Sequence, residues 1–124
     1  MTALGWLFWA NILILVPIGF GTLLRPSSTD QGVFPESAGW RTLVGSLWLA
    51  ILAMSVLGVR QPEAFRWLLV FQVFYKSVWL IAYVLPRMLA GRGREVPAGI
   101  TLSFLVIVLV WPWFIPWSQL FSAP

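Results

Sequence analysis

Lys76 is the residue of this chain whose chemistry most needs an explanation. It is the only lysine, and it lies in the middle of a long apolar run. If this run is a membrane-spanning helix, each of its ends is about 15 Å away at 1.5 Å per residue, too far for the ammonium group to reach water. A charged lysine at mid-bilayer costs about 2.5–3.5 kcal/mol, so we expect Lys76 to face the interior of a helix bundle.

Polar and aromatic side chains share one side of the run with Lys76. They recur at helical spacing, which places them on one face: Gln72, Trp79, Tyr83 and Arg87. In the preceding apolar run, Arg41 and Trp48 share a face, and Trp48 matches Trp79 in depth. An ammonium group beside indole faces gains about 2 kcal/mol when it is desolvated. We therefore predict a basic, aromatic-lined site around Lys76.

A second pair of side chains matches in depth nearer the other membrane face. Asn11 lies in the first apolar run at the level of Gln72 in the third. A hydrogen bond between them would contribute about 0.6–2 kcal/mol within a membrane. The predicted ligand-binding set is thus Lys76, Trp79, Tyr83, Trp48, Arg41, Gln72 and Asn11.

The charge of Lys76 has no obvious counter-ion. All four acidic residues lie outside the apolar runs, and only Asp30 or Glu36 could fold in from a neighbouring loop. Three explanations stay open: an uncharged amine, a structural ammonium group resting on carbonyls and aromatic rings, or an anion-binding group.

The residue types that are absent exclude several kinds of chemistry. There is no cysteine and no histidine, which removes disulfides, thiolate nucleophiles and the ordinary ligands of haem and zinc. Acid–base or nucleophilic work is left to Lys76, Ser77 and the two tyrosines, Tyr75 and Tyr83. We expect no metal site and no enzyme, and a small membrane enzyme or transporter that uses Lys76 is the alternative.

The composition indicates a membrane protein. Of the 124 residues, 60% are hydrophobic and 10% are charged, whereas about 25% are charged in soluble domains. Four apolar runs, residues 4–24, 40–59, 65–85 and 98–113, approach the roughly 20 residues that cross a bilayer as a helix. Short connections between them predict a single all-α domain over residues 1–124, a four-transmembrane-helix up-down bundle.

The charges and tryptophans predict how this bundle lies in a membrane. Most of the arginines lie in or beside two loops, which we call loop one (residues 25–39) and loop three (residues 86–97). They are Arg25, Arg41, Arg87, Arg92 and Arg94. The positive-inside rule then places both loops in the cytoplasm and both termini outside. Six tryptophans lie near the predicted membrane face that carries the termini, and they predict an aromatic belt at that interface: Trp6, Trp9, Trp67, Trp111, Trp113 and Trp117.

Two short motifs carry a family resemblance. Residues 74–80 (FYKSVWL) and 39–41 (GWR), set in the four-span layout, resemble small four-helix bacterial integral membrane proteins of the DoxX-like kind. The resemblance implies the fold, and some DoxX-type proteins are linked with quinone-coupled oxidoreductases. The size is also similar to that of small multidrug transporters, but those need a membrane-embedded glutamate, which this chain lacks. Cation antiport is therefore excluded.

These observations favour a non-enzymatic protein of a bacterial inner membrane. We expect an accessory subunit of a larger membrane complex, or a module that binds a lipid or a quinone at its buried basic site. The expected partners are membrane lipid and other membrane subunits or further copies of this chain. Nucleic acid is not expected, because the arginines lie at helix ends, where they orient a chain in a membrane.

Overall fold

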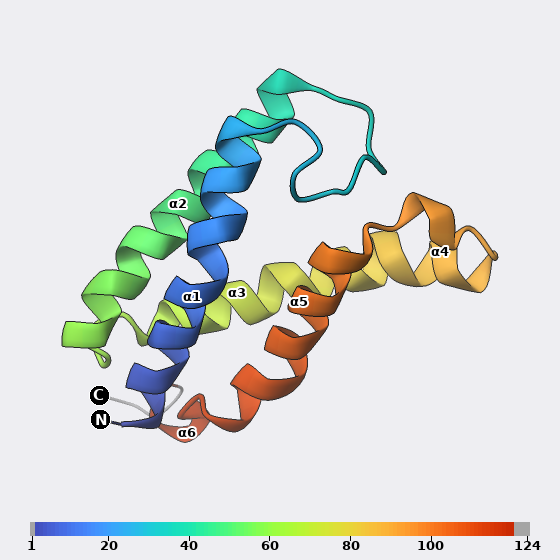
Figure 1. The fold of residues 1–124 in the computed structure, drawn as a ribbon. Helices are drawn as coiled ribbons and strands as arrows, with labels where there is room; N and C mark the ends of the chain where they lie inside the picture. The colour runs from blue at the N-terminus through green and yellow to red at the C-terminus, as the bar shows by residue number, and fades with distance from the viewer. Residues whose placement is uncertain (1, 121–124) are drawn as a thin grey trace.

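The computed structural model of the protein describes residues 2–120, and every regular element in that range is helical (Figure 1). The predicted all-α class is confirmed. The elements in chain order are α1 (Ala3–Leu24), α2 (Ala38–Arg60), α3 (Arg66–Trp79), the π-helix η1 (Leu80–Val84), α4 (Leu85–Leu89), the short 3₁₀ helix η2 (Gly93–Glu95), α5 (Ala98–Val110), the 3₁₀ turn η3 (Trp111–Trp113) and α6 (Trp117–Leu120).

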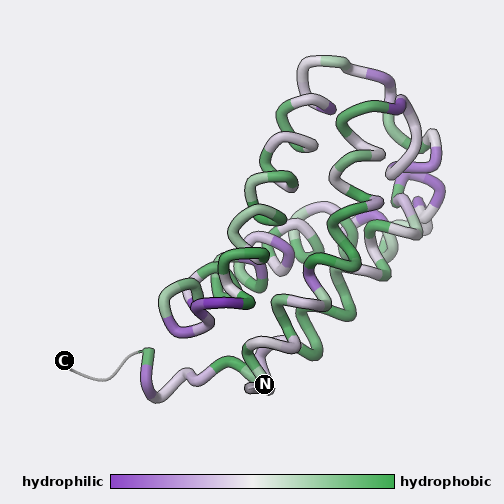
Figure 2. The backbone as a smooth tube through the Cα atoms, turned by 60° about the vertical axis from the view of Figure 1, so that its left-hand side comes forward, coloured by the Kyte–Doolittle hydropathy of each residue, from purple (hydrophilic) through white to green (hydrophobic). Residues whose placement is uncertain are grey.

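Three helices are long and apolar enough to cross a membrane. They are α1, α2 and the continuous helix Arg66–Leu89 made of α3, η1 and α4, with 22, 23 and 24 residues. The fourth apolar helix, Ala98–Trp113, is shorter. Large apolar side chains such as Leu13, Phe74 and Leu89 are exposed on these helices, and Figure 2 shows apolar residues along most of their length. These features are compatible with an integral membrane protein.

The first two helices form a close antiparallel hairpin. Side-chain oxygens of Thr2 and Ser37 cap their N-termini by accepting from Gly5 N and Trp40 N. A glycine sets the spacing near loop one, because a Cβ on Gly45 would lie 2.9 Å from the backbone nitrogen of Leu23. The hairpin therefore tolerates no side chain at this position.

The third span contains a π-turn directly after Trp79. The N–H of Leu85 bonds to the carbonyl of Leu80, five residues back, and not four. Pro86 explains the irregularity, since proline has no N–H to give to the preceding turn and its ring crowds the carbonyl there. The helix nevertheless continues to Leu89.

The α1–α2 hairpin and α3 diverge away from the end that carries the termini. Figure 1 shows loop one hanging in the angle between them. Two contacts hold the loop there: Phe34 packs edge-on against Tyr83 with ring centroids 5.6 Å apart, and Gln31 Oε1 accepts from Gly99 N at 3.3 Å. Loop one thus contacts both the third long helix and α5.

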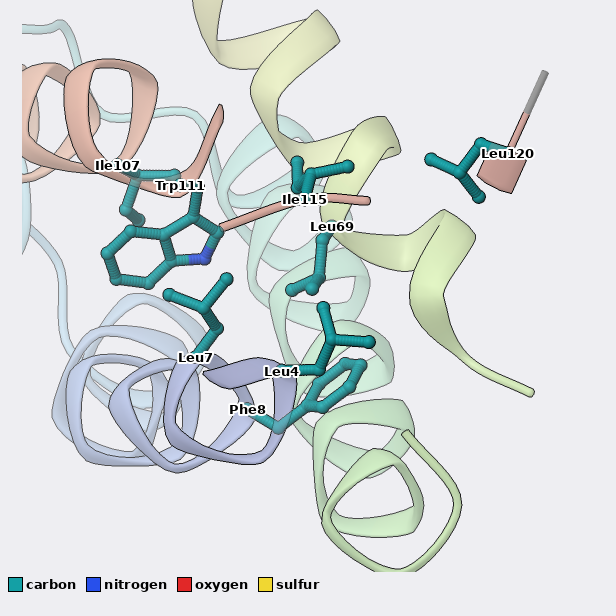
Figure 3. Close-up of a cluster of buried hydrophobic side chains, with 8 residues drawn as sticks. All are labelled: Leu4, Leu7, Phe8, Leu69, Ile107, Trp111, Ile115 and Leu120. Carbon is teal, nitrogen blue, oxygen red and sulfur yellow. The ribbon is translucent and has the colours of Figure 1, made fainter. Parts of the chain in front are cut away.

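The end that carries the termini is closed by a packed apolar cluster (Figure 3). Its buried members come from α1, α3, α5 and the last segment: Leu4, Leu7, Phe8, Leu69, Ile107, Trp111, Ile115 and Leu120. Trp111 was predicted for the interfacial belt, and that prediction is wrong, because its side chain is buried in this cluster with 4% exposure. The other predicted belt members are exposed at the surface: Trp6, Trp9, Trp67, Trp113 and Trp117.

Candidate ligand-binding site

Asn11 is the centre of a buried polar network beside the apolar cluster. The predicted bond is confirmed: Asn11 Nδ2 donates to Gln72 Oε1 at 2.6 Å. The same nitrogen donates to Ser55 Oγ at 3.3 Å, and Trp111 Nε1 donates to Asn11 Oδ1 at 3.2 Å. Ser55 in turn donates to the carbonyl of Ile51 at 2.8 Å. The network therefore joins three spans and the η3 turn.

The indole of Trp111 fixes the direction of this network. An indole nitrogen only donates, so Asn11 must present its oxygen to Trp111 and its NH₂ group to the other partners. Gln72 then presents its oxygen to Asn11, which leaves Gln72 Nε2 buried without a partner in the part of the chain that is described. Asn11 and Gln72 thus serve helix packing at the closed end.

Lys76 is buried one helical turn further along α3, with 2% exposure. Its Nζ lies 4.7 Å from the ring centroid of Phe104 and 5.2 Å from that of Tyr75. We predicted indole rings as its neighbours; that detail is wrong, because α5 turns Phe104 towards the ammonium group. Within residues 2–120 the structure gives Lys76 no ion pair and no hydrogen bond, so ring faces are what compensates its charge.

A cavity of about 350 Å³ opens where the hairpin and α3 diverge. Its inner wall is apolar and aromatic and comes from α2, α3 and α5: Val44, Trp48, Tyr75, Trp79, Ile100 and Phe104. Phe104 organises this wall, since Trp48, Tyr75 and Trp79 all meet its ring edge-on, with centroids 6.3, 6.0 and 5.2 Å away. The volume and lining are typical of sites for small molecules.

Loop one and the adjoining helix ends form the mouth of the cavity. Two arginines and two acids lie there: Arg25, Arg41, Asp30 and Glu36. Arg41 is already engaged, because it donates to Glu36 Oε1 at 3.0 Å and to the carbonyls of Thr22 and Leu23 at 2.8 and 2.9 Å. It thereby satisfies carbonyls at the C-terminal end of α1. The four mouth charges sum to zero.

The structure divides the predicted site residues into groups. Trp48, Trp79 and Arg41 line the cavity, whereas Lys76 lies against two rings of its wall. Asn11 and Gln72 belong to the polar network. Tyr83 stacks on Trp79, with centroids 5.5 Å apart and planes 10° apart, while its hydroxyl donates to the carbonyl of Glu95 in loop three at 2.7 Å.

Two aromatic residues of the wall, Tyr75 and Phe104, were missed in the sequence. Tyr75 lies one turn before Trp79, and its hydroxyl accepts from Trp48 Nε1 at 3.2 Å. The spacing of these two aromatic residues was a usable signal for Tyr75. Phe104 carries no such signal, because it lies in a run of apolar residues without a polar face.

Loop three is fixed by charges outside the cavity. The carboxylate of Glu95 accepts two hydrogen bonds from Arg92 in a bidentate salt bridge, and the bond from Nη2 is 2.8 Å long. Arg87 Nε lies 3.5 Å from Glu95 Oε1. The hydrogen bond from Arg92 lowers the pKa of Glu95. Because Tyr83 also bonds to Glu95, this loop supports the stack behind Trp79.

Neither a protein-family model nor a curated protein nor a solved structure matches this chain. Within residues 2–120, no three acidic residues gather where they could hold a metal ion. The proposals that follow therefore depend on the geometry of the cavity and its surroundings.

Proposed function

We propose that this chain is a small membrane protein that binds one amphiphile, a lipid or a quinone, in the cavity between the α1–α2 hairpin and α3. It acts as a non-enzymatic binding module or accessory subunit of a larger complex in a bacterial inner membrane. The observation that carries the proposal is the aromatic cavity of about 350 Å³ under loop one. We also propose that the chain is related to the DoxX-like proteins that its motifs resemble.

The lining of the cavity supports an amphiphile as the ligand. Its inner wall offers apolar rings and aliphatic side chains, whereas its mouth carries hydroxyl groups and balanced charges from loop one. A ligand with an apolar body and a polar group matches this division. The site lies at one end of the apolar helices, where such molecules collect in a membrane.

Lys76 acts on this ligand from behind the wall. Its Nζ lies against the rings of Tyr75 and Phe104, both of which also line the cavity. A positive charge in surroundings of low dielectric constant favours an electron-rich group on the other side of the rings. In this proposal Lys76 biases the site towards carbonyl or acidic groups without contacting them.

The proposed topology has four spans in an up-down bundle, with loops one and three in the cytoplasm and both termini outside. The helix Ala98–Trp113 has a length of about 24 Å at 1.5 Å per residue, somewhat short of the roughly 30 Å hydrocarbon core. A short span is accommodated by local thinning of the bilayer. Loop two, the connection between α2 and α3, then lies outside with the termini.

Single cysteines test this topology cleanly, because the chain has none of its own. Ser28→Cys, Gln61→Cys, Ala90→Cys and Ser118→Cys introduce one thiol at an exposed position in each connection and in α6. A membrane-impermeant maleimide should label residues 61 and 118 in intact cells, and residues 28 and 90 only after lysis. Labelling of all four from outside, or of 61 together with 28, would overturn the four-span arrangement.

The binding proposal is tested by filling the cavity. Val44→Trp adds a large ring at the wall, whereas Leu43→Trp adds the same ring one residue earlier on α2, where Leu43 is exposed. Native mass spectrometry should find one amphiphile retained by the wild type and by Leu43→Trp, and none by Val44→Trp. Equal retention by all three proteins, or by none, would refute the proposal. Purification with stoichiometric partner proteins would identify the chain as a subunit.

A further inference from the structure

Two hydrogen-bond donors in the cavity wall have no acceptor within residues 2–120. Tyr75 accepts from Trp48 Nε1, and an indole only donates, so the hydroxyl proton of Tyr75 remains available. The indole N–H of Trp79 likewise has no acceptor in this range. Both residues line the cavity. A ligand that brings an acceptor into the cavity would gain a hydrogen bond from each donor that it reaches.

The two side chains that carry these donors are neighbours on α3, and each is held in place. Tyr75 and Trp79 are four residues apart on α3, one helical turn, so their side chains are neighbours on one face. The stack on Tyr83 and the edge contact with Phe104 orient the indole of Trp79. The bond from Trp48 orients the hydroxyl of Tyr75. The π-turn starts only after Trp79, so it does not separate the pair.

The rest of the inner wall gives a ligand nothing else to bond. Its members Val44, Ile100 and Phe104 carry no polar side-chain group, and the indole N–H of Trp48 already donates to Tyr75 Oη. The complementary group on a ligand is therefore an acceptor that brings no donor of its own. A carbonyl oxygen fits, because it offers two lone pairs to two neighbouring donors.

The charges around the cavity favour an uncharged carbonyl over a carboxylate. At the mouth, Arg41 is bonded to Glu36 and to backbone carbonyls. In the wall, the ammonium group of Lys76 rests on the rings of Phe104 and Tyr75. The remaining arginine, Arg25, is exposed at the mouth. A carboxylate at the inner wall would therefore have none of these cations in direct contact, and its desolvation would be costly.

We propose, on the basis of the proposed function, that the ligand is an amphiphile that carries an uncharged carbonyl group, whose oxygen accepts hydrogen bonds from Tyr75 Oη and Trp79 Nε1. Tyr75 and Trp79 are then the residues that determine specificity. Ester lipids and quinones share this chemistry.

Matched probe pairs separate these two sources. One pair is a diester phosphatidylcholine and the diether lipid of the same chain length, which lacks the ester carbonyls. The other pair is a decyl-benzoquinone and the corresponding decyl-1,4-dimethoxybenzene. Affinities are measured with delipidated full-length protein in detergent by isothermal titration calorimetry. In at least one pair, the carbonyl compound should bind at least tenfold more tightly, and that pair identifies the source.

The variants assign the preference to the two donors. Tyr75→Phe should lower the affinity for the preferred carbonyl probe roughly five- to tenfold, which is the usual contribution of one neutral hydrogen bond. The affinity for the carbonyl-free compound of the same pair should stay unchanged. Trp79→Phe keeps a ring while removing the N–H, and should weaken the same probe by a similar factor if Tyr75→Phe does not fold. Trp6→Phe is the matched control, because it also removes an indole N–H, but Trp6 is exposed on α1 and does not line the cavity; it should change neither affinity.

The failures of this inference and of the proposed function differ. Equal binding of both members in each pair, or equal weakening of both by Tyr75→Phe, would overturn the carbonyl assignment and leave an amphiphile site. Tighter binding of decanoate than of either carbonyl probe would show that the site prefers a carboxylate to an uncharged carbonyl group. Absence of binding by all probes to the wild type would overturn both proposals.

Discussion

The two ends of the molecule treat their polar groups differently, because most of those at the end that carries the termini bond to one another, with Gln72 Nε2 as an exception among the described residues. At the end that carries the termini, Asn11 joins Gln72, Ser55 and Trp111, and Trp111 is also a member of the packed apolar cluster (Figure 3). At the loop-one end, the helices diverge around a cavity, and Tyr75 and Trp79 carry donors in its wall that have no acceptor among residues 2–120. Both ends are built from α1, α2, α3 and α5.

The difference indicates a division of labour between the two ends. A closed end with mutually bonded polar groups fixes the helices relative to one another, and it does so without a ligand. The open end can then keep a cavity without loss of the fold. Lys76 lies between these regions, one turn from Gln72 and beside the cavity wall.

The largest predicted effect is the loss of the polar network at the closed end. Asn11→Leu keeps a buried side chain of similar size but strands the indole N–H of Trp111 and the oxygen of Gln72. We expect the free energy of unfolding to fall by about 3 kcal/mol, because each stranded buried group costs about 1–3 kcal/mol. Unfolding of the purified protein in mixed micelles measures the change. Ser46→Ala removes an exposed hydroxyl and should have almost no effect; equal stabilities of the two variants would contradict the division between the ends.

The hairpin that both ends share should be the next most sensitive. Gly45→Ala places a methyl group 2.9 Å from the backbone nitrogen of Leu23, and backbone cannot move aside easily. We expect a loss of about 2 kcal/mol from overpacking. Gly39→Ala, in the same helix, meets no atom within 4 Å and should be neutral or slightly stabilising. Thermal unfolding in detergent compares the pair, and a neutral Gly45→Ala would show that the hairpin is looser than described.

Lys76→Met shows to which region this residue belongs. Methionine keeps the length of the side chain and removes the charge, whose partners within residues 2–120 are ring faces. We expect the protein to become more stable by about 1 kcal/mol, since the desolvation cost disappears together with the weaker cation–π attraction. Affinity for the amphiphile should fall only two- to threefold, on the order of a long-range charge effect. Complete loss of ligand in native mass spectrometry would instead place Lys76 in direct contact with it.

The smallest effect is expected in loop three, beside the open end. The hydrogen bond from Arg92 lowers the pKa of Glu95 below its unfolded value of about 4.3. This bond therefore stabilises the folded protein fully above that pH, and the contribution is lost as the pH falls through the lowered folded pKa. Glu95→Gln should lower the unfolding temperature slightly at pH 7, and the difference from wild type should shrink as the pH falls through the lowered pKa of Glu95.

The control for this pH dependence is Glu63→Gln. Glu63 is more exposed, and its oxygen lies 3.7 Å from Arg66, so its removal should leave the unfolding temperature unchanged at each pH. A difference between Glu95→Gln and wild type that persists unchanged at low pH would rule out the ionised pair as its cause.

Much of the fold could be predicted because apolar runs and their ends are local features. The expected run 4–24 corresponds to α1 (Ala3–Leu24), and the match in depth of Asn11 and Gln72 correctly predicted their hydrogen bond. The buried face of α3 was also predictable, since Gln72 and Lys76 mark it with polar groups.

The cavity could not be predicted, because it depends on how the helices rotate and cross. The run 98–113 has no polar stripe to orient it, so nothing in the sequence shows that Phe104 turns towards Lys76 or that Trp111 turns inward. The divergence of the spans also depends on loop one, whose contacts with Tyr83 and Gly99 are distant in sequence.

A density map of the protein purified in mild detergent tests the central claim most directly. We expect one elongated density between Trp48, Trp79 and Phe104, with its polar end within hydrogen-bonding distance of Tyr75 Oη, and continuous side-chain packing around Asn11 at the other end. The wild type should show this density, and the Val44→Trp variant should lack it. A wild-type map in which the side chains of α2, α3 and α5 close the cavity, or in which the density lies only on the outer surface of the helices, would contradict the account.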